Sequence, residues 1–230
     1  MEQLKHIAFI PDGNRRWAVS HGLSALKGHE SGFENVSRLL SSLIANKIQY
    51  VTIFAFSTEN WNRSVEEVSH LIWLFKKWFG SYENYLNSNG VRIKVIGDLS
   101  RLPQDLQDEI TTLTENTKNN DKITIICALS YSGRGEIVRA AKKIAQDVLD
   151  KKLAIDQIDE DLFSSSLDLA DIPEPDILVR TSEQRISNFL LWHIAYSEIL
   201  FIDKYWPDLD ESDVKHIVDV FSKRKRRYGK

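Results

Sequence analysis

Residues 6–18, His6-Ile-Ala-Phe-Ile-Pro-Asp-Gly-Asn-Arg-Arg-Trp-Ala18, join a short strand-like run to a polar loop. The run is nearly continuous in apolar residues, which is typical of a strand buried on both faces. Gly13 allows a close backbone approach, and a helix start at Arg15–Trp17 would supply free amides. Because ligands bind at the carboxyl ends of strands in open parallel sheets, this loop is a candidate anion site.

Runs rich in β-branched and aromatic residues alternate with helical patterns along the rest of the chain. We expect strands at His6–Ile10, Tyr50–Phe56, Val91–Ile96, Lys122–Leu129, Asp176–Arg180 and Ile199–Ile202. Helical periodicity predicts helices at Gly28–Ala45, Val65–Leu86, Gln104–Thr117, Arg134–Leu149, Asn188–Tyr196 and Ser212–Arg226. This order predicts an α/β fold with a six-stranded, mostly parallel sheet whose two faces are covered by helices. Neither a repeat nor a linker divides residues 1–230, so we expect one domain.

The composition is that of an ordinary globular protein. The 230 residues hold 30 Lys and Arg against 33 Asp and Glu, a formal net charge of −3, which disfavours a protein that coats nucleic acid. Cys127 is the one cysteine, and its apolar neighbours favour a buried hydrophobe over a metal ligand. With no signal-peptide pattern and no apolar stretch of roughly 20 residues, we expect a cytoplasmic protein.

Polar residues also follow three other predicted strands. These segments are Ser57-Thr-Glu-Asn-Trp-Asn-Arg63, Ser130-Tyr-Ser-Gly-Arg134 and Arg180-Thr-Ser-Glu-Gln-Arg-Ile-Ser-Asn188. Parallel strands bring such loops to one edge of the sheet, so we expect a common crevice. Arg180 and Arg185 are candidates for an anion clamp, although arginines are also common on surfaces.

Asp12 lies beside the predicted anion site and would be repelled by a bound anion unless a cation lies between them. Mg²⁺ suits that arrangement, because it is commonly bound by one or two carboxylates together with substrate phosphates. A simple turn at Asp12-Gly13 explains these two residues equally well. P-loop, zinc-protease, serine-esterase and dinucleotide-binding motifs are absent from the sequence. The residues alone therefore indicate an anion-binding α/β enzyme that uses Mg²⁺.

The predicted helix Val65–Leu86 carries two apolar stripes. One stripe packs on the sheet, which leaves the second, with Leu71, Leu74, Trp78 and Tyr85, in need of a partner. Burial or a dimer contact is the simpler interpretation. The alternative is that part of the second stripe lines a slot for a long apolar ligand.

Five segments together resemble the cis-prenyltransferase family, most closely its bacterial undecaprenyl diphosphate synthases. They are residues 6–18, Gly28-His29, Phe54-Ala-Phe-Ser-Thr-Glu-Asn-Trp-Asn-Arg63, Ser187-Asn-Phe-Leu-Leu-Trp192 and Ala195-Tyr-Ser-Glu198. The resemblance covers nearly the whole chain, and the aspartate-rich motif of trans-prenyltransferases is missing. It implies stepwise condensation of isopentenyl diphosphate onto an allylic diphosphate such as farnesyl diphosphate, with an apolar tunnel between sheet and helices for a long-chain, undecaprenyl-type product used in cell-wall synthesis.

The resemblance also implies roles for single residues. Asp12 and Glu198 would hold Mg²⁺, and Asp12 and Asn60 would be catalytic, with Asn60 assisting proton removal. The allylic diphosphate would be bound by Gly13, Asn14, Arg15, Arg16 and His29. Residues bounding the substrate region would be Trp17, Ser57, Thr58, Glu59, Trp61 and Arg63, while Arg180, Arg185, Ile186 and Ser187 would hold isopentenyl diphosphate. Ala55 would leave the tunnel entrance open.

Some positions depart from the family pattern. The segment Arg180–Arg185 is one residue shorter and lacks a glycine, Ala25 replaces a common arginine, and Ser130 and Ser132 replace the more common Asn and Gly. These departures predict weakened substrate binding. A terminal Arg227-Tyr-Gly229 resembles a family motif that enters the neighbouring subunit, which predicts a homodimer. The alternatives are a non-catalytic subunit of such an enzyme, a short-chain synthase and an unrelated phosphate-ester hydrolase.

Overall fold

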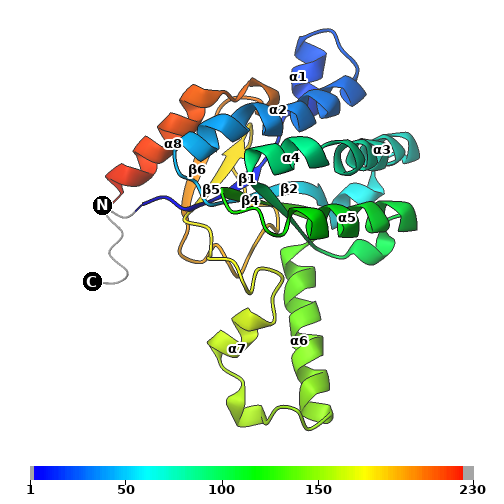
Figure 1. Cartoon of the computed structure of the whole chain (residues 1–230), viewed down its shortest axis with the longest axis vertical. Helices are drawn as coiled ribbons and strands as arrows, with labels where there is room; N and C mark the ends of the chain where they lie inside the picture. Colours follow the sequence, from blue (N-terminus) through cyan, green and yellow to red (C-terminus); the bar gives the residue numbers. More distant parts are fainter. Residues whose placement is uncertain (1–2, 225–230) are drawn as a thin grey trace.

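The computed structural model describes residues 3–224 and is built on one six-stranded sheet. Its strands are β1 (His6–Ile10), β2 (Tyr50–Ser57), β3 (Val91–Ile96), β4 (Ile123–Tyr131), β5 (Ile177–Thr181) and β6 (Glu198–Ile202). They lie in the order β3-β4-β2-β1-β5-β6, and every pair is parallel (Figure 1). The predicted α/β fold is confirmed.

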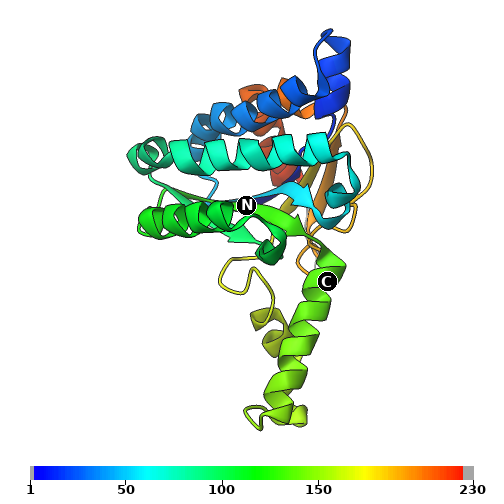
Figure 2. The same cartoon turned by 90° about the vertical axis from the view of Figure 1, so that its right-hand side faces the viewer.

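The described part of the chain contains eight α-helices, of which α1 to α7 lie between strands and α8 follows β6. They are α1 (Asn14–Ser20), α2 (Ala25–Ala45), α3 (Val65–Ser81), α4 (Glu83–Asn89), α5 (Gln104–Thr117), α6 (Gly133–Leu149), α7 (Glu160–Ser165) and α8 (Glu211–Lys223). Short 3₁₀ turns add η1 (Thr58–Asn62), η2 (Leu99–Arg101), η3 (Ile155–Gln157) and η4 (Trp206–Asp208). Helix α6 leaves the body of the molecule with α7 beside it (Figures 1 and 2).

The two faces of the sheet are covered differently. Helices α2, α3, α5 and α8 contribute buried apolar residues to the larger core on one face (Figure 2). The smaller core on the other face is closed mainly by irregular segments that carry Leu169, Ile172, Phe189 and Leu190. The expectation that helices cover both faces was therefore wrong for this second face.

One predicted helix is absent and one is broken. Residues 188–196 form turns instead of a helix, because Ser187, Asn188 and Leu190 have positive φ angles, which a right-handed helix excludes. The stretch predicted as one helix from Val65 to Leu86 ends at Ser81 and restarts at Glu83 as α4. Its two stripes are mostly core: Leu74 and Trp78 are buried, while Tyr85 is 39% exposed.

Within residues 3–224, none of the helices has the length and apolar character needed to cross a membrane. The predicted Arg227–Gly229 motif lies outside the described residues.

Candidate active site

The site lies where the chain reverses its direction of travel across the sheet. From β1 the chain moves to β2 on one side, and it later returns to β5 on the other side, so the loops after β1, β2 and β5 surround one crevice. The Asp12 amide donates to the Thr181 hydroxyl at 2.9 Å, which ties the first of these loops to the last. The predicted convergence of the loops therefore takes place at a switch point of the topology.

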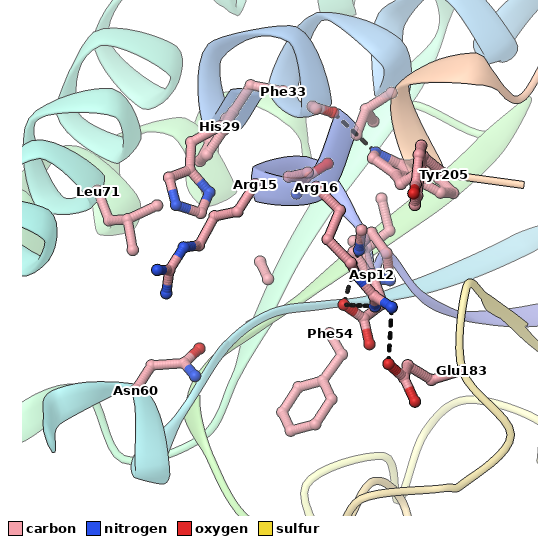
Figure 3. Close-up of a pocket in the computed structure, with 18 of the residues that line it drawn as sticks. Asp12, Arg15, Arg16, His29, Phe33, Phe54, Asn60, Leu71, Glu183 and Tyr205 are labelled. Atoms are coloured by element: carbon pink, nitrogen blue, oxygen red, sulfur yellow. Dashed lines mark hydrogen bonds and ion pairs between the residues drawn. The ribbon is translucent and has the colours of Figure 1, made fainter. Parts of the chain in front are cut away.

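The first pocket encloses about 890 Å³ and has a charged mouth and an apolar interior. Its mouth is lined by Asp12, Gly13, Asn14, Arg15, Arg16, His29, Asn60, Arg63, Glu183 and Tyr205 (Figure 3). Its apolar side is lined by Phe33, Val36, Ile53, Phe54, Ala55 and Leu71. Phe54 and Ala55 both face the pocket because the register of β2 against β4 shifts between Phe54 and Phe56, and such a bulge re-aims neighbouring side chains.

Close packing of α1 on α2 forms the upper wall of this pocket. A Cβ at Gly28 would lie 2.2 Å from the Asn14 carbonyl oxygen, and one at Gly32 would lie 2.7 Å from the Asn14 Oδ1. Helix α2 begins at Ala25, and the Ser24 hydroxyl caps it by accepting from the Lys27 amide. The sequence predicted that a helix starts at Gly28, and this was wrong, because Gly28 lies in the first turn of α2. Its lack of a side chain lets α1 and α2 approach each other.

Asp12 is held by three donors in its ionised form. Its Oδ2 accepts from Arg180 at 2.8 Å, and its Oδ1 accepts from the Gly13 amide at 2.6 Å and from Arg16 at 3.4 Å. Partial burial opposes ionisation, but the bonds from Arg180 and Gly13 outweigh it, so the pKa of Asp12 lies below its usual value. Asp12 is therefore a carboxylate at neutral pH.

The second pocket, of about 800 Å³, shares Pro11, Asp12, Phe54, Asn60 and Arg63 with the first. Its remaining lining residues are Ile10, Ser57, Glu59, Arg134, Arg180, Arg185, Ile186, Ser187, Asn188 and Leu191. Four arginines against two carboxylates make this pocket suitable for a polyanion.

Arg180 is the most constrained cation of the second pocket. It is 4% exposed, donates to the Ser187 hydroxyl at 2.6 Å and also donates to the Arg185 carbonyl. Its Nε atom is buried and has no hydrogen-bond partner among the described residues. The shorter loop thus still brings Arg180 and Arg185 to one pocket, with Ser182 at a φ of 72°.

Glu67 of α3 pairs with cationic groups at the mouth of the first pocket. Its Oε1 lies 2.8 Å from Arg63 and 3.1 Å from His29 Nε2, and its Oε2 lies 3.7 Å from Arg15. Burial, only partly offset by Glu67, lowers the pKa of His29. His29 is therefore a neutral hydrogen-bonding group at pH 7 rather than a further positive charge.

Three residues that the resemblance assigned to the substrate region line neither pocket. The Trp17 indole donates to Asp208 at 2.6 Å and stacks on His21. The Trp61 indole donates to the Ser130 hydroxyl at 3.0 Å. Thr58, the third, begins η1. In this structure, these residues support the loops instead of facing the cavities.

Glu198 does not lie with Asp12 within one chain. Glu198 is the first residue of β6 and is paired with Ile177, whereas Asp12 lies beside Thr181, at the opposite end of β5. Four residues of strand separate the two positions by roughly 13 Å. Within one chain, these two carboxylates therefore do not meet at one metal ion, and a Mg²⁺ site that includes Glu198 stays a prediction.

Several residues of the site were not singled out from the sequence. Among them are Glu67, Arg134 and Glu183, which line a pocket or pair with its arginines. Glu67 lies four residues after Arg63, the spacing at which opposite charges pair along a helix, although Arg63 itself precedes the Ser64 cap of α3. That spacing was the available signal for Glu67, while Glu183 and Arg134 lay inside segments already quoted.

Comparison with known proteins agrees with this geometry. The prenyltransferase family model, described as undecaprenyl diphosphate synthase, matches residues 10–229. The ditrans,polycis-undecaprenyl-diphosphate synthase ((2E,6E)-farnesyl-diphosphate specific) of Legionella pneumophila (strain Paris) is 42% identical over 98% of this chain and 95% of its own length. An isoprenyl transferase of Fusobacterium nucleatum is 44% identical over 98% of this chain and 95% of its own.

Two solved structures share the fold. Lavandulyl diphosphate synthase from Lavandula x intermedia, solved with dimethylallyl diphosphate, superposes with a TM-score of 0.95 at 36% identity, covering 99% of both chains. A Campylobacter jejuni protein described as a probable undecaprenyl diphosphate synthase superposes with a TM-score of 0.83 at 34% identity, covering 100% of both chains. The chain therefore belongs to the undecaprenyl diphosphate synthase family of cis-prenyltransferases and is an isoprenyl transferase.

Proposed function

We propose that residues 1–230 form one cis-prenyltransferase domain that condenses isopentenyl diphosphate with an allylic diphosphate, farnesyl diphosphate, in a Mg²⁺-dependent reaction. The observation that carries the proposal is the pair of pockets that meet at Asp12. One pocket combines a cationic mouth with an apolar interior, as a prenyl diphosphate requires. The other is polar and rich in arginine, as the small second diphosphate requires.

Asp12 fits a Mg²⁺ ion that is bound jointly with a substrate. In residues 3–224 no three His, Cys, Asp or Glu side chains cluster as a metal site, so a purely protein-bound ion is not supported. Mg²⁺ commonly takes one or two carboxylates and completes its shell with phosphate oxygens and water. Asp12 is ionised and its side chain is 29% exposed at the junction of the pockets. When bound there, Mg²⁺ would neutralise charge on the leaving diphosphate.

The first pocket is the proposed site of the allylic substrate. Arg15, Arg16 and the Gly13–Asn14 backbone would bind its diphosphate, and neutral His29 would donate to it once its single ring N–H turns from Glu67 to a phosphate oxygen. Phe33, Ala55 and the other apolar lining residues would surround the prenyl chain. A dry apolar surround protects an allylic cation from capture by water.

The second pocket is the proposed site of isopentenyl diphosphate. Arg180, Arg185 and Ser187 would bind its phosphates, and the buried unpartnered Nε of Arg180 supports an anionic ligand here. The carbon–oxygen bond of the allylic diphosphate breaks with its electron pair on oxygen, and the double bond of isopentenyl diphosphate forms the new carbon–carbon bond. A proton then leaves C2 of isopentenyl diphosphate and is taken up by the released diphosphate. Asn60, whose Oδ1 accepts from the Ser57 amide at 3.0 Å, would assist that step from the wall common to both pockets.

The proposal has three further parts. The product is a long-chain, undecaprenyl-type diphosphate that serves as a carrier-lipid precursor for cell-wall synthesis, the enzyme is a homodimer, and it is located in the cytoplasm. Sequence similarity to the Legionella enzyme supports the product class. A non-catalytic subunit is disfavoured, because Asp12, Asn60 and Arg185 all line the pockets, where a purely binding partner would not need them.

A short-chain product is the second candidate, and a specific observation favours it. Phe33, which lines the first pocket, packs edge-on against Phe75, with 5.0 Å between ring centroids. Phe75 and the next turns of α3 are buried in the core, so the described apolar lining ends near Leu71. A growing chain would have to displace these side chains to extend farther.

The experiment that tests the proposal is product formation by the purified full chain. Incubation with Mg²⁺, farnesyl diphosphate and labelled isopentenyl diphosphate should yield extractable polyprenyl diphosphate, and chromatography of the product gives its length. Loss of product when Mg²⁺ is chelated is expected. Label that stays entirely in isopentenyl diphosphate would contradict the proposal, and a product extended by only one unit would favour the short-chain candidate.

A further inference from the structure

Glu183 contacts one arginine of each pocket. Its Oε1 lies 2.8 Å from Arg16 of the first pocket, and its Oε2 lies 2.8 Å from Arg185 of the second. Figure 3 shows its carboxylate facing the Arg16 side chain across the mouth of the first pocket, with Asp12 beside Arg16. Both oxygens of one carboxylate are thus used, each on a cation that the proposed function assigns to a different diphosphate.

The backbone that carries Glu183 is fixed against the first loop. The Ser182 amide donates to the Ile202 carbonyl at 3.0 Å, and the Glu183 amide donates to the Thr181 carbonyl at 2.8 Å. Ser182 also lies so close to Gly13 that a Cβ on that glycine would be 2.9 Å from the Ser182 Oγ. The main chain at Glu183 therefore stays at the junction while its side chain is free to leave either arginine.

Two other carboxylates of the site pair with its arginines, and Asp12 shares Arg16 with Glu183. Glu67 pairs with Arg15, Arg63 and His29 from the helix behind the first pocket. Asp12 pairs with Arg16 and Arg180 and lies in both pockets. Glu183 differs from Asp12 in the exposure of its partners: Asp12 pairs with Arg180, which is 5% exposed, whereas both arginines that pair with Glu183 are at least 45% exposed, so its ion pairs are the ones that a ligand can reach.

We propose that Glu183 is a positioning residue that couples the two diphosphate sites. This inference rests on the proposed function. A diphosphate entering either pocket takes over the arginine bound there, because its charge exceeds that of a carboxylate and it repels Glu183. Once the carboxylate has left its bridging position, the second diphosphate meets an arginine that is already free. Each substrate thereby raises the affinity for the other, and thermodynamic linkage makes the two effects equal.

The coupling should be moderate, because the arginine side chains are 45% and 60% exposed in these two ion pairs. Exposed ion pairs contribute little individually. We expect the first ligand to lower the Kd of the second by a factor of about three to ten, near the lower end of measured couplings.

Calorimetric titration of the full chain in Mg²⁺ buffer tests the proposal. Isopentenyl diphosphate is titrated with and without a saturating farnesyl diphosphate analogue whose bridging oxygen is replaced by sulfur, so that no transfer occurs. Glu183→Gln removes the charge at constant size. Without the analogue, its Kd for isopentenyl diphosphate should already be lower than that of the wild type, and adding the analogue should change this Kd less than it does in the wild type. Glu183→Asp keeps the charge but is too short to span both arginines, so it should also lose coupling.

Glu66→Gln is the matched control, because Glu66 is exposed and lines neither pocket. This variant removes one negative charge, as Glu183→Gln does, and should show the same coupling between the two ligands as the wild type. If the loss of any nearby negative charge were enough to abolish coupling, Glu66→Gln would lose it as well. Equal coupling in Glu183→Gln and wild type, or no coupling in a wild type that forms product, would overturn this inference alone. A wild type that binds neither ligand and forms no product would overturn the proposed function as well.

Discussion

Arg180 and Asp12 form a half-buried pair at the junction of the pockets, with their side chains 5% and 29% exposed. A buried guanidinium that has partners on several sides fixes the geometry of its neighbours. Arg180 joins the carboxylate of the first loop to the Ser187 hydroxyl and the Arg185 carbonyl of the last. Through this one side chain, loops that are about 170 residues apart in sequence hold a common shape.

His6 provides a residue-scale prediction about pH. Burial lowers the pKa of His6 to about 4, and the neutral ring donates from Nδ1 to the Pro173 carbonyl while Nε2 accepts from the Thr52 hydroxyl. The unfolded chain takes up a proton near pH 6.5 that the folded protein takes up only near pH 4. The free energy of unfolding should therefore fall as the pH drops through this window, by about 2 kcal/mol from His6 between pH 7.5 and 5.

Urea unfolding of the wild type and of His6→Gln at these two pH values measures this contribution. The variant lacks the titrating ring, so its loss of stability on acidification should be smaller by about 2 kcal/mol. His29, whose pKa is also lowered, contributes equally to both proteins and cancels in the difference. An identical pH dependence in the two proteins would show that His6 is not the group responsible.

At the scale of elements, the crossing of α1 and α2 shapes the mouth of the first pocket. Gly28→Ala would place a methyl group 2.2 Å from the Asn14 carbonyl oxygen and 2.9 Å from the Ala18 Cβ. Overpacking of this kind should lower the free energy of unfolding by about 1–3 kcal/mol. Because Asn14 and its neighbours line the pocket, the KM for the allylic substrate should rise as well.

Gly80→Ala is the matched control for this prediction. Gly80 also lies inside a helix, α3, but the nearest atom to its added Cβ is Glu109 Cδ at 3.8 Å, an ordinary contact. Alanine is the better helix former, so this variant should be as stable as the wild type or up to about 1 kcal/mol more stable. Urea unfolding of both variants gives the comparison, and equal stability of the two would refute the close-packing argument.

The strands were well predicted from the sequence because their signal is local. Continuous apolar runs bounded by Gly, Pro and polar loops mark buried parallel strands, and β1 and β3 begin and end at the predicted residues.

Residues 188–196 were wrongly predicted as a helix because tertiary contacts decide their backbone. Phe189 and Leu190 are buried against the second face of the sheet, and His193 lies 3.0 Å from the buried Glu136. The weak helix formers Gly80 and Ser81 were the available signal for the break before α4.

The candidate site was predictable to the extent that it depends on topology. Loops after parallel strands share an edge, so Asp12, Asn60 and Arg185 could be grouped from their positions in the sequence. Glu198 was grouped with Asp12 by the resemblance alone, although the predicted strand Ile199–Ile202 already put Glu198 at the start of a strand, where β6 begins, and not at the end that carries the site loops. The side-chain pairing of Glu67 and Glu183 depends on loop geometry that periodicity does not encode.

At the scale of the whole molecule, the helix layer limits the depth of the first pocket. Phe75 of α3 packs against Phe33 and lies 6.2 Å from Phe56 between ring centroids. Replacing it by leucine should leave space behind Phe33 and shift the products toward longer chains. Chromatography of the products formed by wild type and Phe75→Leu measures the shift.

Phe79→Leu removes the same atoms one turn farther along α3, where Phe79 is equally buried and packs against Trp78. This variant should be destabilised to a similar degree while its product length stays that of the wild type. If both variants changed product length alike, loss of helix packing in general, and not the end wall of the pocket, would set the length.

The central claim is that the Asp12 carboxylate, at the junction of two pockets, promotes loss of diphosphate from a prenyl chain. The most direct test compares Asp12→Asn with the wild type in single-turnover transfer of labelled isopentenyl diphosphate to farnesyl diphosphate with saturating Mg²⁺, alongside urea unfolding of both proteins. We expect the transfer rate to fall about 10²–10³-fold, as for loss of one group that stabilises developing charge, while the variant remains folded. A folded variant that transfers at the wild-type rate would contradict the account.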